Sequence, residues 1–108
     1  MYVTLVIRAV FIQKYMICEE LYKIIEDRKK NMPKGSYIAS LFRGGNDRII
    51  QKIGEEATEV VIAAKNESKE RIIFEVADLL FHILVLLSAK DIEPKEIMQE
   101  LKIRDSRK

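Results

Sequence analysis

The chain has 108 residues, which is the length of one domain, and long aliphatic and helix-forming residues dominate a composition without tryptophan. The formal net charge is only +2, so the chain as a whole is not a strongly charged partner for nucleic acid. A single cysteine, Cys18, excludes an internal disulfide and favours a reducing cytoplasm. We expect one all-α domain that acts in the cytoplasm.

Residues 1–15 are apolar and β-branched. Arg8 interrupts the apolar run, no basic region precedes it and no small-residue cleavage site follows, which argues against a signal peptide. The run is also too short to span a membrane, and we expect no membrane partner. A strand and a helix continuous with the next segment both remain open, and Met16 is an alternative start. We therefore treat 1–15 as an extension of uncertain structure and 16–108 as the single domain.

The first expected helix is Ile17–Lys30, ending near Asn31–Pro33. Its acidic residues come early and its basic residues late, an order that complements the helix dipole.

The stretch from Pro33 to Asn46 is a long connection, and long ordered connections are often functional. Ser36 could donate to a phosphate and Tyr37 could stack on a base. Equally, Ser36 could cap a short turn while Tyr37 and Phe42 pack on the core. The sequence leaves both interpretations open.

Two helical segments follow, Lys52–Lys65 and Arg71–Leu87, and the short link between them predicts an antiparallel hairpin. The earlier helix starts at Asn46 or Asp47. Its expected core face is Ile49, Ile50, Ile53, Ala57, Val60, Val61 and Ala64. Gly54 interrupts this helix, and the close approach of another helix or a ligand would explain it.

The later helix, capped by Ser68, is apolar on nearly every side, which is typical of a helix buried all round. One hairpin cannot cover such a helix, so we expect a homodimer with a four-helix core. The expected contact face is Phe74, Ala77, Phe81 and Leu84. The helix should stop near Ala89–Asp91, and a last helix should start at Glu93–Pro94, with Ile97, Met98 and Leu101 as its apolar face.

Four carboxylates are expected to meet in the hairpin. Glu56 and Glu59 are three residues apart and so share a helix face, as do Glu75 and Asp78. Buried carboxylates must be paired, protonated or bound to metal. Oxygen-only ligands suit Mg²⁺, with Mn²⁺ as an alternative. The competing interpretation is a set of ion pairs with basic neighbours at a bundle rim.

His82 lies one turn after Asp78 on the same stripe. It is either a buried histidine bonded to a carboxylate, or a group that orients Asp78 or touches the substrate. Since no Glu-x-x-His pair is present here, di-iron chemistry is disfavoured.

Residues 28–52 carry seven basic side chains against one acid, Asp47. The basic residues are Arg28, Lys29, Lys30, Lys34, Arg43, Arg48 and Lys52. A basic stretch beside a carboxylate cluster suits a phosphate-rich ligand bridged by metal, and it suits duplex DNA poorly because the acids would repel the backbone. A merely solvated basic surface is the alternative.

The motifs K-I-G-E-E-A-T-E-V-V-I-A-A-K (52–65) and E-V-A-D-L-L-F-H-I-L-V-L-L (75–87) resemble phosphoribosyl-ATP pyrophosphohydrolase. The upstream L-Y-K-I-I-E-D-R-K-K-N (21–31) and G-S-Y (35–37) fit the same family. The Glu-x-x-Glu and Glu-x-x-Asp pattern alone indicates only the wider MazG-type group of helical nucleotide pyrophosphohydrolases.

The resemblance implies an α-helical dimer that uses Mg²⁺ to hydrolyse phosphoribosyl-ATP to phosphoribosyl-AMP and pyrophosphate, the second step of histidine biosynthesis. By matching position, the metal ligands are Glu56, Glu59, Glu75 and Asp78, and the catalytic carboxylates are Glu55, Glu56 and Glu59. The expected substrate-binding residues are Arg28, Lys34, Ser36, Tyr37, Arg43, Lys52 and His82, with Lys52 on the triphosphate. The alternatives are a house-cleaning dNTP pyrophosphohydrolase and a non-catalytic helical interaction module.

Overall fold

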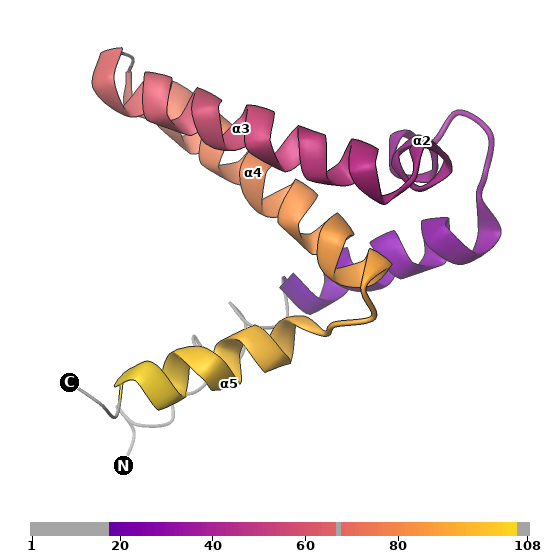
Figure 1. Cartoon of the computed structure of the whole chain (residues 1–108). Helices are drawn as coiled ribbons and strands as arrows, with labels where there is room; N and C mark the ends of the chain where they lie inside the picture. Colours follow the sequence, from indigo (N-terminus) through magenta and orange to yellow (C-terminus); the bar gives the residue numbers. More distant parts are fainter. Residues whose placement is uncertain (1–17, 67, 106–108) are drawn as a thin grey trace, which may run out of the picture.

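The computed structural model describes residues 18–66 and 68–105, and these are helical except for short connections, with no strand among them. Residues 18–31 form the first helix, which is unlabelled in Figure 1. It is followed by α2 (Tyr37–Gly44), α3 (Asn46–Asn66), α4 (Lys69–Ala89) and α5 (Pro94–Asp105). The expected all-α class is confirmed. The expected extension, residues 1–15, lies outside the described residues.

Local signals in the sequence set the helix ends. The Ser68 hydroxyl accepts a hydrogen bond from the Arg71 amide at 3.3 Å, so Ser68 caps α4 as expected. Pro94 occupies the first position of α5, and the Glu96 carboxylate reaches back to the Glu93 amide at 2.8 Å. Gly45, which ends α2, adopts φ +84°, a conformation that favours glycine.

The long helices α3 and α4 run antiparallel and side by side, which confirms the expected hairpin (Figure 1). The core lies at one end of it, where the helix of residues 18–31 and α2 cover the start of α3 and the end of α4. Its fully buried large aliphatic side chains are Ile25, Leu41, Ile49 and Val85. Two long-range hydrogen bonds stabilise the core end of the hairpin. Tyr22 donates to the Ile92 carbonyl at 2.8 Å, and Lys29 donates to the Ser88 carbonyl at 2.6 Å.

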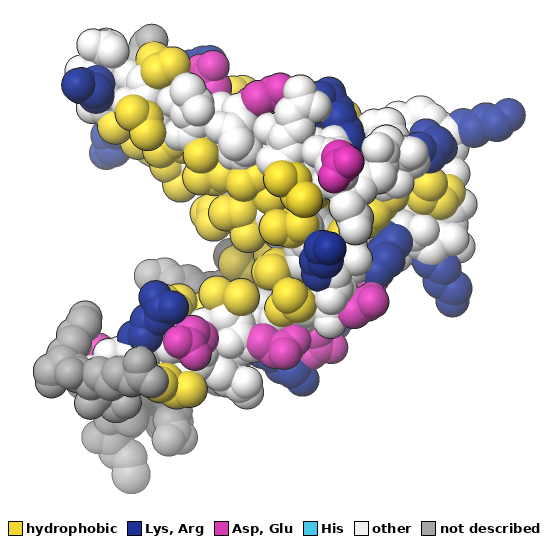
Figure 2. Space-filling model, viewed as in Figure 1, with side chains coloured by type: hydrophobic (Ala, Val, Ile, Leu, Met, Phe, Trp, Pro, Cys, Tyr) yellow, Lys and Arg dark blue, Asp and Glu magenta, His cyan; other side chains and the backbone are white. Residues whose placement is uncertain are grey.

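The described part of the single chain leaves the rest of the hairpin uncovered, as expected of one hairpin, so burial of the later helix on all sides stays a prediction that depends on a second chain. Phe74 is 58% exposed, and Val61 of α3 is 59% exposed. We call the uncovered apolar side chains of α3 and α4 the hairpin patch; they are Ile50, Val61, Ile62, Ile73, Phe74, Val76 and Leu80. Figure 2 shows hydrophobic side chains gathered along the side of the hairpin that faces α5.

The expected faces of α3 and α4 need correction. In α3, Ala63 is buried, whereas Ile50, Val61 and Ala64 are exposed. In α4, Leu84 already packs in the core of its own chain and is not free for a partner. The reason is the same in both helices: apolar residues occur on more than one face, so periodicity does not tell which face the chain itself covers.

A side chain added at Gly54 would meet no atom within 4 Å of its Cβ among the described residues, so nothing in that part of the chain explains this glycine by close approach. Among those residues one helix, α4, is long and apolar enough to cross a membrane by length and composition alone. It nevertheless packs along α3 and carries buried Glu75 and His82, as a core helix does.

The molecule is open rather than compact. Its Cα radius of gyration is 16.2 Å, against about 13 Å for a compact chain of this size. In Figure 1, α5 turns back below the hairpin and diverges from it, and its predicted apolar residues Ile97 and Leu101 are exposed. A chain that leaves this much apolar surface uncovered does not complete a hydrophobic core on its own.

Candidate metal centre

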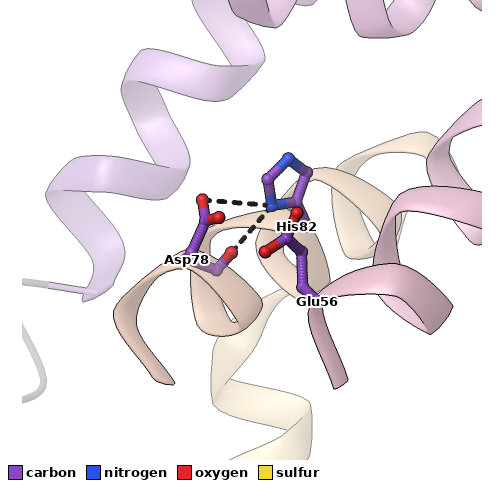
Figure 3. A group of neighbouring side chains, drawn as sticks. All are labelled: Glu56, Asp78 and His82. Atoms are coloured by element: carbon purple, nitrogen blue, oxygen red, sulfur yellow. Dashed lines mark hydrogen bonds and ion pairs between the residues drawn. The ribbon is translucent and has the colours of Figure 1, made fainter. Parts of the chain in front are cut away.

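Three side chains meet across the hairpin, Glu56 from α3 and Asp78 and His82 from α4 (Figure 3). One ligand atom of each lies within 4.8 Å of the others, close enough to share an ion. Glu56 and His82 are buried, and Asp78 is half-buried. The antiparallel pairing of α3 and α4 therefore brings together one carboxylate from each predicted pair.

Glu56 is held as a carboxylate. Its Oε1 lies 3.1 Å from Lys52 Nζ, one helical turn earlier. A hydrogen bond from Asp78 and then the bond to Lys52 lower the pKa of Glu56 despite its burial. The same bond to Glu56 raises the pKa of Lys52, so this pair is charged on both sides.

Asp78 behaves in the opposite way. Burial raises the pKa of Asp78, and the hydrogen bond to Glu56 and the negative charge of Glu56 raise it further. The closeness of the two carboxyl groups therefore favours the charged form of Glu56 and the neutral form of Asp78. A divalent cation would relieve the repulsion between the Glu56 and Asp78 carboxylates. Both groups offer the oxygen ligands that hard cations prefer.

The other predicted carboxylates lie around this pair. Glu75 is only 3% exposed and is bonded to Arg71 at 2.6 Å. Its charge contributes to the raised pKa of Asp78. Glu55 is at the surface, 3.6 Å from Lys52. Glu59 is exposed on α3, outside the group that could share one ion. The structure thus brings Glu56 and Asp78 together and leaves Glu59 outside, and the metal-binding roles of all four carboxylates stay predictions.

His82 has both ring nitrogens engaged. Nδ1 lies 2.7 Å from the backbone carbonyl oxygen of Asp78 and 3.6 Å from its carboxylate, and Nε2 lies 2.9 Å from the Tyr37 hydroxyl. Tyr37 is half exposed; its ring stacks on Phe81 at 6.2 Å between centroids and meets His82 edge-on. The bond between Tyr37 and His82 was not predicted. Its only signal in the sequence is that a buried histidine needs a partner for each nitrogen.

The predicted phosphate-binding residues surround the connection before α2. Ser36 caps α2 by accepting a hydrogen bond from the Ala39 amide at 3.1 Å. Arg43 donates to the carbonyls of Met32 and Pro33 at 3.4 and 3.3 Å, and so fastens the connection to α2.

Further along the same stretch, Arg28 is bonded to its neighbour Asp27 at 2.6 Å. Lys34 lies exposed in the turn at Gly35. For Ser36 the capping alternative is confirmed, and its phosphate role stays a prediction.

In this hairpin, acidic side chains from both helices point to one place. The arrangement puts the chain in a class of helical proteins suited to hold a divalent cation. The model of the family described as phosphoribosyl-ATP pyrophosphohydrolase matches residues 18–105. The chain belongs to this family of hydrolases.

Individual relatives agree with the family match. Over 88 residues the chain is 52% identical to the phosphoribosyl-ATP pyrophosphatase of Geobacter sulfurreducens, covering 82% of each chain. It is 47% identical over 94 residues to the enzyme of the same name from Clostridium acetobutylicum, covering 87% of this chain and 86% of the relative. It is also 51% identical over 88 residues to a histidine biosynthesis bifunctional protein of Caldanaerobacter subterraneus, covering 82% of this chain and 43% of that protein.

Proposed function

We propose that this chain hydrolyses phosphoribosyl-ATP to phosphoribosyl-AMP and pyrophosphate, in the second step of histidine biosynthesis, and that it does so in the cytoplasm. The observation that carries the proposal is the meeting of Glu56 and Asp78, from two helices, within reach of one ion in a chain of this family. Such a pair is unfavourable for an isolated protein and favourable for one that receives a cation.

The donor set fits Mg²⁺, with Mn²⁺ as the alternative. Glu56 and Asp78 would hold the ion, joined by Glu59 and Glu75 from the same two helices. When bound, the cation would neutralise the charge of the triphosphate and polarise the α-phosphorus for in-line attack by water. The Glu75 carboxylate is paired with Arg71 at 2.6 Å in this structure, so binding of the ion by Glu75 would compete with that ion pair.

The chain's own groups then orient the reactants. Lys52 is partly exposed between Glu55 and Glu56, and its ammonium group would bind the triphosphate. Glu55, at the surface beside it, is the carboxylate best placed to accept a proton from the attacking water, because Glu56 is occupied by Lys52 and Asp78. Glu59, which is exposed one turn later, is the second candidate for this role.

The phosphoribosyl end of the substrate needs its own contacts. The half-exposed ring of Tyr37 beside the centre is suited to stack on the adenine. His82 contacts that ring edge-on and is bonded to its hydroxyl. Lys34 lies in the connection before α2, Arg43 of α2 is bonded to that connection, and Arg28 lies in the helix before it. We assign this basic group to the second phosphate. A plain dNTP carries no second phosphate and would not need it.

Neutralising this basic group should therefore affect one substrate selectively. Lys34→Gln or Arg43→Gln should raise KM for phosphoribosyl-ATP about ten- to a hundredfold, the loss of one charge-assisted phosphate contact, and should barely change any weak hydrolysis of ATP. Steady-state kinetics with both nucleotides measures this. Lys65→Gln, at the far end of α3, is the matched control and should change neither value. An equal loss for both nucleotides would mean that these cations serve the triphosphate instead.

We also propose that the active form is a homodimer in which the hairpin patch is buried against a second copy. This would give the hairpin the four-helix core that one chain lacks. It also offers an explanation for Gly54, which lies on the same stripe of α3 as Ile50 and Val61, where the absence of a side chain lets another helix approach.

A direct test is pyrophosphate release by the purified protein from phosphoribosyl-ATP, ATP and the dNTPs, with Mg²⁺ and with a chelator. The proposal predicts fast release from phosphoribosyl-ATP alone, and only with the metal. Release from dNTPs at equal rates would favour the house-cleaning alternative. No release from any nucleotide would favour the non-catalytic module.

A further inference from the structure

His82 lies within reach of Glu56 and Asp78, so by proximity alone it could be a third metal ligand. Its hydrogen bonds point to a different role. The carbonyl oxygen of Asp78 can only accept, so Nδ1, at 2.7 Å from it, carries the ring hydrogen. Nε2 then accepts the hydroxyl hydrogen of Tyr37 at 2.9 Å. Neither nitrogen presents a free lone pair to the space between the carboxylates.

These bonds connect two parts of the chain that are far apart in sequence. Tyr37 is the first residue of α2 and directly follows Ser36, at the end of the basic connection. His82 is almost fully buried on α4, one turn after Asp78, with its ring edge-on to both Tyr37 and Phe81. The His82 ring is hydrogen-bonded at both nitrogens and packed by two aromatic rings. Its rotation away from Asp78 would leave buried polar groups without partners.

We propose that Tyr37 and His82 are positioning residues for the metal centre: the Tyr37 hydroxyl holds the His82 ring, and His82 holds the turn of α4 that aims the Asp78 carboxylate at Glu56. His82 is then not a ligand of the ion. The inference rests on the proposed function only in that the Glu56–Asp78 pair binds a divalent cation. Such outer partners of metal ligands typically contribute 10- to 100-fold to metal affinity.

The first test asks whether His82 touches the ion, and it needs no substrate. Mn²⁺ is bound to the full chain, and electron spin-echo envelope modulation is recorded. We expect no strong ¹⁴N coupling of the kind that a directly bound imidazole gives. Strong ¹⁴N coupling that disappears in His82→Gln would make His82 a ligand and overturn the proposal.

The second test asks whether Tyr37 acts through its hydroxyl. Tyr37→Phe keeps the ring and its stacking on Phe81 but removes the bond to Nε2, and it should weaken Mn²⁺ binding about tenfold. Tyr22→Phe is the matched control, because it also loses one buried hydroxyl, bonded to the Ile92 carbonyl, away from the centre. It should leave Mn²⁺ affinity unchanged, whatever it does to stability.

A double-mutant cycle completes the design. In His82→Asn the amide can still donate from the position of Nδ1 to the Asp78 carbonyl, but it cannot reach the Tyr37 hydroxyl. If Tyr37 acts through His82, adding Tyr37→Phe to this variant should cause no further loss of Mn²⁺ affinity. Mn²⁺ affinity equal to wild type in Tyr37→Phe would overturn the proposal while leaving the metal centre intact. Absence of any Mn²⁺ binding by the wild-type chain would contradict the metal centre itself, and the positioning roles with it.

Discussion

Asp78→Asn should reduce Mg²⁺-dependent hydrolysis by more than about a hundredfold, the upper end of what outer partners of metal ligands contribute, because it removes a ligand itself. The metal-free variant should nevertheless be as stable as wild type or more stable. The pKa of Asp78 is raised in the folded chain, so the stability that its proton gives is present at low pH and is lost as pH rises through that raised pKa. The amide of asparagine donates to Glu56 as the protonated carboxyl does, and it does so at every pH.

The stability advantage of Asp78→Asn over wild type should therefore grow from acid to alkaline pH. Urea unfolding of both proteins in a chelator, at several pH values, measures it. Mg²⁺ should then stabilise wild type and not the variant, because only the native wild-type site binds it.

Glu56→Gln provides the contrasting variant, with the same loss of activity and the opposite effect on metal-free stability. The pKa of Glu56 is lowered, so its charge contributes stability above its ordinary pKa, and that contribution is lost as pH falls. Glutamine removes the ion pair with Lys52, at a cost of about 1.5–3 kcal/mol for a hydrogen bond to a charged group. If Asp78→Asn were instead the more destabilised variant without metal, the carboxylates would be structural partners and not a metal site.

The second large effect concerns assembly. Leu80→Asp should convert the proposed dimer into monomers or into unfolded protein, since it places a charge in the middle of the hairpin patch. Light scattering at micromolar concentration, together with circular dichroism, distinguishes the dimer, a folded monomer and an unfolded chain.

Lys69→Asp is the control for this experiment. It places the same acid on the same helix, at its exposed first residue and outside the patch, and it should leave the dimer intact. A wild-type chain that scatters as a folded monomer would contradict the dimer outright, and a Leu80→Asp variant that remains dimeric would show that the hairpin patch is not its interface.

The parts of the fold that depend on local chemistry could be predicted from the sequence. Ser68 and Pro94 mark helix starts because capping and the missing amide of proline act within one turn. That carboxylates of the two helices meet followed from helical spacing and a short link, since a hairpin of two straight helices has few possible arrangements.

What could not be predicted depends on how the helices meet. The register of α3 against α4 decides that Glu56 enters the shared site while Glu59 stays exposed, and spacing three residues apart does not distinguish the two. Two hydrogen bonds join distant segments, from Tyr37 to His82 and from Arg43 to the Met32 carbonyl, so no local pattern signals them. The exposure of Ile50 and Val61 was missed because an apolar face that its own chain leaves uncovered has the same periodicity as one that faces the core.

The central claim is that water attacks the α-phosphorus of phosphoribosyl-ATP at a site built on Glu56 and Asp78. Reaction in ¹⁸O-labelled water followed by mass spectrometry of both products tests it most directly. We predict one ¹⁸O atom in phosphoribosyl-AMP and none in pyrophosphate, with turnover that stops when Mg²⁺ is chelated. Label in the pyrophosphate, or turnover that continues in the chelator, would contradict the account.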